Sequence, residues 1–160
     1  MGVRVRGELT EVRPATEEDV EVLVAWHSDP DVSRYWDGDT FTSDEMRTRL
    51  ARADVDAFVV EAEGRPIGYL QTWREGDGGG VDMFLIPAAR GRRYGPDAAR
   101  AVARALLEQG WTRVTADPYL WNEAAIKAWL RAGFERIERH PADDEHSADW
   151  LLLEFRDGIP

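Results

Sequence analysis

An apolar segment that runs into a basic, glycine-containing loop and then into an alanine-rich helix limits the folds open to this chain. The apolar segment is VDMFLIP, residues 81–87, and RGRRYGPDAARAV, residues 90–102, follows it. The pattern predicts a buried strand, then a helix that opens at Pro96 and stops at Gly110. A helix N-terminus beside several arginines suits a bound anion. An ordinary basic turn with proline at the first helical position explains the stretch equally well.

The whole pattern predicts one domain over residues 1–160, with elements in the order β α α β β β α β α β β. Capping signals place the helices, because a Ser, Thr or Asn side chain accepts from the first free amides. The expected helices follow Thr16, run from Thr42 to about Ala53, from Pro96 to Gly110, and from Asn122 to Gly133. The expected strands cover residues 9–13, 57–63, 66–75, 81–87, 111–117, 134–140 and 149–155.

Composition excludes several function classes. The chain has no cysteine, which removes disulfides, thiolate metal sites and an acyl-cysteine intermediate. A net charge of −11 argues against a nucleic-acid partner and favours cationic ligands, although most carboxylates are explained by solubility alone. We expect no membrane partner and a cytoplasmic location, because no apolar run approaches the roughly 18 residues of a span and no signal peptide is present. The histidines, His27, His140 and His146, lack metal-ligand spacing, so no metal is expected.

Two motifs resemble the GCN5-related N-acetyltransferases (GNAT). The loop RGRRYG is similar to the family's acyl-CoA motif, with Arg90 and Gly95 in register and Arg93 in place of the middle glycine. DPYLWNEAAIKAWLRAGF, residues 117–134, is similar to the strand and helix that follow it in the family. The resemblance implies an α+β GNAT fold, a mixed and mostly antiparallel sheet of six to seven strands flanked by four helices.

The same resemblance implies acetyl-CoA as cosubstrate, with its phosphates at the start of the third helix. It places thirteen positions near acetyl-CoA. These are Phe84, Leu85, Ile86, Arg90, Gly91, Arg92, Arg93, Tyr94, Gly95, Pro96, Asn122, Ala125 and Trp129. Trp129 stands where many relatives have a tyrosine, and an indole offers no transferable proton near neutral pH. Packing beside Ile126 and Leu130 is the favoured interpretation of Trp129.

Three segments, WHSDPDVSRYW (residues 26–36), VDMFL (81–85) and ADPYLWNEAAI (116–126), look most like the aminoglycoside 6'-N-acetyltransferases. This resemblance implies that two aspartates face the acceptor amine. By position these are Asp82 and Asp117. An aliphatic amine with a pKa of about 10 is an ammonium ion at neutral pH and must lose a proton before it attacks a thioester. We assign Asp117 as the base and Asp82 as the positioning group, and the reverse assignment stays open. The structural alternative for Asp117 is a turn cap, and that for Asp82 is a polar residue on the exposed face of a strand.

Further acceptor contacts are expected from the segment WHSDPDVSRYWDGD, residues 26–39, and from the acidic loop near the C-terminus. Trp36 is the better pocket candidate, with Asp37 beside it, and Trp26 is expected to belong partly to the core. Asp143, within the run Asp143 to Glu145, would add negative charge at the mouth, although such a run is usually a solvated face.

The sequence therefore predicts direct acetyl transfer to a cationic amine, most consistent with the 6'-amine of an aminoglycoside, in a ternary complex. Three other functions stay open: a siderophore-type N-acyltransferase, an acetyltransferase for protein N-termini, and a CoA-binding sensor without turnover. Asp82 argues against the siderophore type, in which a histidine tends to occupy this position. Both a monomer and a homodimer are compatible with the sequence.

Overall fold

The computed structural model describes residues 4–157, and the strands of this range form one sheet in the order β1-β2-β3-β4-β5-β6-β8-β7. Neighbouring strands are antiparallel except β5 and β6, which are parallel. The strands are β1 (Val5–Arg6), β2 (Glu11–Pro14), β3 (Val55–Ala62), β4 (Arg65–Glu75), β5 (Gly78–Leu85), β6 (Val114–Ala116), β7 (Phe134–His140) and β8 (Trp150–Phe155). The expected α+β class and mostly antiparallel sheet are confirmed.

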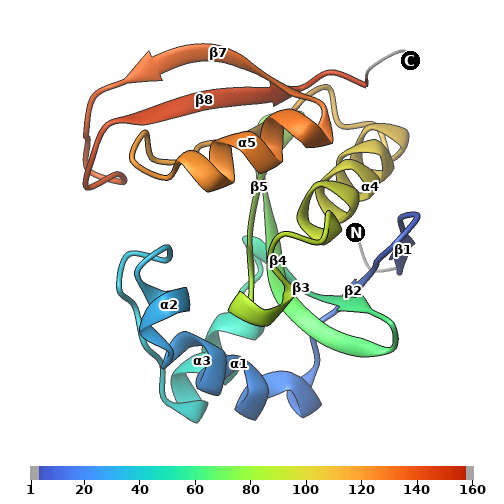
Figure 1. Ribbon diagram of the computed structural model, residues 1–160, viewed down its shortest axis with the longest axis vertical. Coiled ribbons are helices and arrows are strands. Elements are labelled where there is room, and N and C mark those ends of the chain that lie inside the picture. The colour runs from blue at the N-terminus through green and yellow to red at the C-terminus, as the bar shows by residue number, and fades with distance from the viewer. Residues whose placement is uncertain (1–3, 158–160) are drawn as a thin grey trace.

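The α-helices are α1 (Val20–His27), α2 (Pro30–Ser33), α3 (Ser43–Leu50), α4 (Tyr94–Glu108) and α5 (Glu123–Ala132), and 3-10 turns cover Glu17–Asp19 and Pro87–Ala89. Figure 1 shows α5 with β7 and β8 at one end of the molecule and α1 to α3 at the other. No helix within residues 4–157 has the length and apolarity needed to cross a membrane.

The structure adds one strand and one helix to the predicted pattern. The helix α2 begins at Pro30, where the side chain of Asp29 accepts from the amide of Asp31 at 2.9 Å. The Asp29-Pro30 pair, which we expected only to follow a helix, therefore also starts one. The strand β1 is too short to give a sequence pattern and is defined by its pairing with β2. The described sheet thus has eight strands, and five α-helices flank it.

Several predicted boundaries also move, and β6 keeps only residues 114–116 of the strand expected over residues 111–117. The helix α3 ends at Leu50 rather than near Ala53, and α4 begins at Tyr94 rather than Pro96. The strand β5 starts at Gly78, inside the stretch expected to be a turn. A Cβ on Gly80 would lie 2.3 Å from the indole of Trp73, so glycine is required there for the ring to pack across the strand.

Two apolar cores lie on opposite faces of the sheet. The larger core includes Val102 and Leu106 of α4 and Ile126 and Trp129 of α5. The smaller core gathers the inner faces of α1 to α3 against Tyr69 of β4 and Phe84 of β5. Because side chains alternate along β5, Asp82 lies on the same face as Phe84 and so toward the smaller core.

His27 lies inside the smaller core among aromatic rings. Its ring meets those of Phe41 and Phe84 edge-on, with centroids 4.8 and 5.1 Å apart. Among the described residues neither ring nitrogen has a hydrogen-bond partner. Burial first, and then the charge of Arg49, lowers the pKa of His27 to about 4, so the ring is neutral at physiological pH.

The first turn of α4 is anchored by Asp97. Its carboxylate accepts from the amides of Glu8, Leu9 and Thr10 at 2.9 to 3.0 Å, and from the Thr10 hydroxyl at 2.7 Å. Asp97 thereby fixes the N-terminus of α4 against the turn between β1 and β2. This anchor holds in place the loop that carries the basic motif.

Candidate active site

The parallel strands β5 and β6 pair over a short stretch and then separate. The register joins Gly79 to Val114 and Gly80 to Thr115, and the rest of β5 lies beyond this pairing. Asp82 lies within β5, two residues after Gly80, and Asp117 follows the last residue of β6. The structure therefore brings both predicted catalytic aspartates to the point where the two strands diverge.

Asp82 has the environment of a carboxyl group that titrates near neutral pH. Burial is the largest cause, and the negative charges of Asp117 and Asp37 add to it, raising the pKa of Asp82 to about 8. The amide of Met83, which donates to Asp82 at 2.9 Å, and the guanidinium of Arg49 act in the opposite direction. A group with this pKa can bind and release a proton under physiological conditions.

Arg49 is a site residue that the sequence did not indicate. It reaches from α3 and donates at 3.1 Å to Gln71 Oε1, which also accepts from the Tyr69 hydroxyl at 3.1 Å. Gln71 lies opposite Asp82 in the β4 and β5 register. The cation is thus placed on the same side of the sheet as Asp82 by a residue of the neighbouring strand.

Asp117 is paired with a histidine that sequence reasoning set aside. Its Oδ2 lies 2.7 Å from Nε2 of His146, and Nδ1 of the same ring lies 2.9 Å from Oδ1 of Asp143. Asp143 also accepts from Trp150 Nε1 at 3.1 Å and from the amides of Glu145 and His146 at 2.9 and 2.8 Å. His146 thus connects Asp143 to Asp117, and no local spacing in the sequence indicated this connection.

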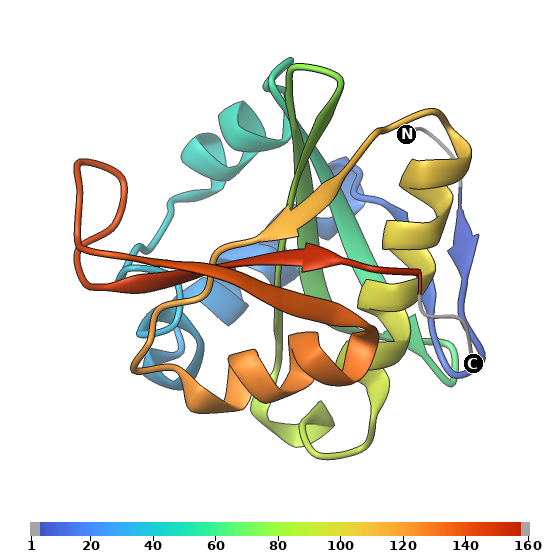
Figure 2. The same cartoon turned by 90° about the horizontal axis from the view of Figure 1, so that it is seen from above.

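An aromatic stack lies beside these groups and spans two distant segments. Trp121 stacks on Tyr119 and Tyr35, with ring centroids 5.6 and 5.8 Å apart. The Tyr119 hydroxyl bonds Asp37 Oδ1 at 2.6 Å. Figure 2 shows the loop between β7 and β8 on the same side of the molecule as the segment after α2. Asp37 is thus held beside the aromatic stack, and its negative charge helps to raise the pKa of Asp82.

Trp26 belongs partly to the smaller core, as expected, whereas the expectation for Trp36 fails. Trp36 is 7% exposed and packs in the smaller core, with its ring 5.4 Å from Phe84. Trp26 is only partly buried and meets the edge of Phe84 at 6.2 Å. The expectation that Trp36 would line the pocket is wrong because the turns after α2 direct its ring inward. Arg49 lies over that ring, 6.0 Å from its centroid.

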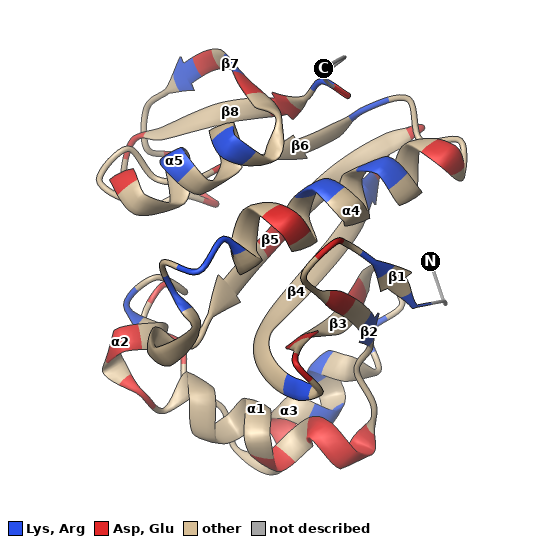
Figure 3. Ribbon diagram, turned by 45° about the vertical axis from the view of Figure 1, so that its right-hand side comes forward, with Lys and Arg blue, Asp and Glu red and all other residues tan. Residues whose placement is uncertain are grey.

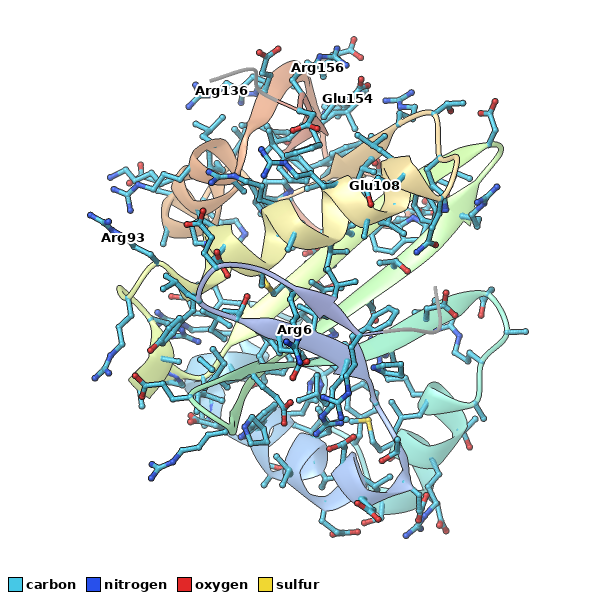
Figure 4. All side chains as sticks on the ribbon, turned by 90° about the vertical axis from the view of Figure 1, so that its right-hand side faces the viewer. Arg6, Arg93, Glu108, Arg136, Glu154 and Arg156 are labelled. Carbon is cyan, nitrogen blue, oxygen red and sulfur yellow. The ribbon has the colours of Figure 1, made fainter. Side chains whose placement is uncertain are left out.

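The basic loop before α4 has the backbone of a glycine-rich turn. Gly91 has φ of 77°, and Arg93 has φ of 67°, a left-handed conformation that glycine favours and arginine rarely adopts. Arg93 therefore has a backbone conformation that suits the glycine expected at this position. Figure 3 shows this loop as a basic segment leading into α4, and in Figure 4 the side chain of Arg93 extends away from the protein body.

The three arginines of the loop differ in availability. Arg90 donates to the backbone oxygens of Leu85 at 3.1 Å and Asp31 at 2.8 Å, and it lies over the Tyr35 ring. Its guanidinium thus joins the end of β5 to α2. Arg92 and Arg93 are exposed and form no ion pair within the described range. They are the side chains of this loop that are free to meet an anion.

The amides of the loop add to this anion site. Tyr94 and Gly95, in the first turn of α4, have amides with no helical acceptor, whereas Pro96 has no amide hydrogen. A Cβ on Gly95 would make ordinary contacts of 3.6 Å to Leu85, so the fold itself does not require glycine there.

The remaining residues expected to contact acetyl-CoA either cap a helix or pack in one of the two cores. Asn122 Oδ1 accepts from the Ala125 amide at 3.2 Å and caps α5. Trp129 is 5% exposed and packs edge-on against Phe134, which agrees with the packing role favoured from the sequence. Phe84 is buried in the smaller core, and Leu85 and Ile86 pack against the larger one.

Residues 10–135 match the family described as the acetyltransferase (GNAT) domain. The chain belongs to this family. This acetyltransferase is 27% identical over 147 residues to aminoglycoside N(6')-acetyltransferase type 1 from Klebsiella pneumoniae, with 78% of this chain and 73% of that protein covered. The protein of the same name from Serratia marcescens gives the same figures.

Solved structures of GNAT acetyltransferases share the fold. Aminoglycoside acetyltransferase AAC(6')-Ib in complex with paromomycin and acetyl-CoA is 24% identical, with a TM-score of 0.80 over 92% of this chain and 93% of that one. The same protein with coenzyme A is 25% identical, with a TM-score of 0.78 over 91% and 93%. Spermidine N-acetyltransferase from Vibrio cholerae is 12% identical, with a TM-score of 0.80 over 92% and 95%.

Proposed function

We propose that this acetyltransferase transfers an acetyl group from acetyl-CoA to the 6'-amine of an aminoglycoside, by direct transfer in a ternary complex and within a single domain over residues 1–160. The observation that carries the proposal is the placement of two carboxyl groups, Asp82 and Asp117, where β5 and β6 separate. An aminoglycoside as the acceptor is supported by the names of two relatives that are 27% identical to this chain. The absence of cysteine supports transfer without an acyl-cysteine.

The basic loop fits the phosphates of acetyl-CoA. The free amides of Tyr94 and Gly95 and the helix dipole favour negative charge at the start of α4. Arg92 and Arg93 add side-chain cations, whereas Arg90 holds the loop against α2. Gly95 fits this role because the fold tolerates a side chain there but a closely approaching phosphate would not.

We assign Asp82 as the general base, which reverses the assignment made from the sequence. The carboxylate of Asp82 accepts a proton from the acceptor ammonium, and the amine then forms the C–N bond at the thioester carbonyl. The C–S bond breaks, its electron pair leaves on sulfur, and the second proton of the attacking nitrogen passes through solvent to the thiolate. A thiol with an ordinary pKa of about 8.5 is a tolerable leaving group without a protein acid, which fits the buried Trp129.

Asp117 is less suited to be the base because it is paired with His146. Its place at the end of β6 suits it to bind an ammonium group of the acceptor. Asp37, held by Tyr119, supplies further negative charge at the mouth. An aminoglycoside carries several ammonium groups on rigid rings, so several separated carboxylates fit it better than they fit a small monoamine.

The test is thiol release from acetyl-CoA with kanamycin, tobramycin, a matched aminoglycoside that has a hydroxyl at the 6' position, and an N6-hydroxylysine analogue. We expect turnover with the first two, a product acetylated at the 6'-nitrogen by NMR, and loss of that product with the 6'-hydroxyl compound. A preference for the hydroxylamine would instead support a siderophore-type enzyme. Binding of acetyl-CoA without turnover of any amine would support a sensor.

A further inference from the structure

His146 lies between two carboxylates, with one ring nitrogen directed at each. The contacts are 2.7 Å to Asp117 and 2.9 Å to Asp143. A neutral imidazole has one N–H, so it can donate to one carboxylate only and would present a lone pair to the other. The imidazolium ion has two N–H groups and satisfies both. The geometry therefore fits a charged ring.

The surroundings of His146 favour the same protonation state. Its ring stacks on Trp150 at 4.1 Å with an interplanar angle of 13°, an arrangement in which an aromatic face attracts a cation. The edge of the Tyr119 ring closes another side. Burial acts to lower the pKa of His146, but the hydrogen bonds and charges of Asp117 and Asp143 outweigh it, so the net direction is upward.

We propose that His146 is a positioning residue of the acceptor site, held as an imidazolium ion that orients Asp117 and offsets its charge toward Asp82. This inference rests on the proposed function, because it concerns the acceptor side of acetyl transfer. His146 touches neither of the reacting groups in the proposed mechanism and acts through Asp117. Among residues 4–157, no cluster of His, Asp and Glu is arranged to hold a metal ion, so the contacts of His146 are described by hydrogen bonding alone.

The charge on His146 affects the base through Asp117. Asp117 and Asp37 raise the pKa of Asp82, whereas Arg49 lowers it, and Tyr69 is the further titratable group that faces Asp82. With the imidazolium removed, the negative charge of Asp117 acts on Asp82 without compensation. The pKa of Asp82 then rises further, and a smaller fraction of the base is ionised at neutral pH. The loss of activity should therefore be greatest at low pH.

The experiment compares the pH dependence of kcat/KM for kanamycin in the parent and in His146→Gln, which keeps an N–H donor but no charge. We expect the acid limb to move to higher pH. At pH 6.5 the variant should lose about five- to tenfold in kcat/KM, the size of effect given by one nearby charge, and it should recover near pH 9. The KM for acetyl-CoA should be unchanged.

The matched control is His140→Gln. His140 also stacks on Trp150, with ring centroids 4.4 Å apart, but its charged neighbour is Glu138 on the same strand rather than Asp117. We expect its acid limb to stay at the parental pH. An equal loss at every pH in His146→Gln, with the limb unmoved, would show that His146 is only structural and would overturn the proposal.

A second measurement needs no acceptor and separates this proposal from the proposed function. In protein labelled with 15N-histidine, NMR should show both ring nitrogens of His146 protonated at pH 7, and Asp143→Asn should lower the pKa of that ring. A neutral ring at pH 7 overturns the inference even if aminoglycosides are acetylated. A protonated ring in an enzyme that acetylates no aminoglycoside overturns the proposed function instead. The Asp143→Asn variant also serves if His146→Gln fails to fold.

Discussion

Tyr119 donates a hydrogen bond of 2.6 Å to Asp37, a residue 82 positions earlier in the chain. Tyr119 lies in the loop between β6 and α5, and Asp37 follows α2, so the bond joins segments from the two ends of the fold. Burial, and then the hydrogen bond to Asp37, raises the pKa of Tyr119 above its usual value. The phenol therefore stays protonated and remains a donor through the physiological range.

Replacing Tyr119 by phenylalanine removes this donor and keeps the ring in the aromatic stack. We expect the acceptor KM to rise about three- to tenfold, which corresponds to the roughly 0.5–1.5 kcal/mol that a typical hydrogen bond contributes. The KM for acetyl-CoA and the turnover number should change less than about twofold, because the phosphate loop is not involved. Steady-state kinetics with both substrates measure this, and equal changes in the two KM values would contradict a role confined to the acceptor.

Asp82→Asn should nearly abolish turnover and yet stabilise the enzyme at high pH. Loss of a general base lowers turnover on the order of 10²-fold or more. The folded-state pKa of Asp82, about 8, lies above its ordinary value of 3.8, so the folded state retains a proton that the unfolded chain releases between these pH values. Asp82 therefore makes a favourable contribution to the free energy of unfolding at pH values below 3.8, and this contribution is lost as the pH rises through about 8.

The asparagine variant of Asp82 does not titrate, so it should escape this loss. Its melting temperature should exceed that of the parent at pH 8.5 to 9 and approach it near pH 4. Thermal unfolding across this range provides the measurement. Full activity at neutral pH would remove Asp82 as the base.

Asp117→Asn tests the alternative assignment of the base. Because Asp117 raises the pKa of Asp82, its removal should shift the acid limb of the activity profile to lower pH. We expect the acceptor KM to rise more than the turnover number falls. A loss of turnover as large as in Asp82→Asn, with no shift of the limb, would restore Asp117 as the base.

Arg93 allows the backbone and the side chain of the phosphate loop to be tested separately. Arg93→Ala and Arg93→Gly both remove the guanidinium, but only glycine relieves the left-handed conformation. We expect both variants to bind acetyl-CoA more weakly, by an amount that shrinks at high salt. Arg93→Gly should be the more stable of the two by about 1 kcal/mol. Calorimetry and thermal unfolding measure the two effects, and equal affinity in parent and variants would exclude a phosphate contact.

Much of the fold could be predicted because its signals are local. The starts of α3 and α5 were predicted correctly, because the capping box of Thr42 and Glu45 and the cap at Asn122 each depend on residues three apart in the sequence. The two aspartates were found through the resemblance of VDMFL and ADPYLWNEAAI to segments of the aminoglycoside 6'-N-acetyltransferases. The loop was also recognised although Arg93 replaces the motif glycine, and the backbone of Arg93 has a left-handed conformation that suits glycine.

The rest of the site depends on contacts between distant segments. His146 reaches Asp117 across 29 positions, from a loop whose path no periodic pattern describes. Arg49 is placed beside Asp82 by Gln71 on the adjacent strand, and strand pairing is not visible in one sequence. The expectation for Trp36 was wrong for a related reason, because the path of the chain after α2 turns its ring inward.

The backbone of Arg93 also says something about how this sequence could vary. Every arginine codon lies one base change from a glycine codon, so a substitution that would relieve the left-handed conformation is accessible in a single mutational step. Relief of backbone strain alone would favour that step. An arginine is expected to persist in this conformation only where its guanidinium contributes to activity. Selection for activity and selection for stability therefore act in opposite directions at position 93.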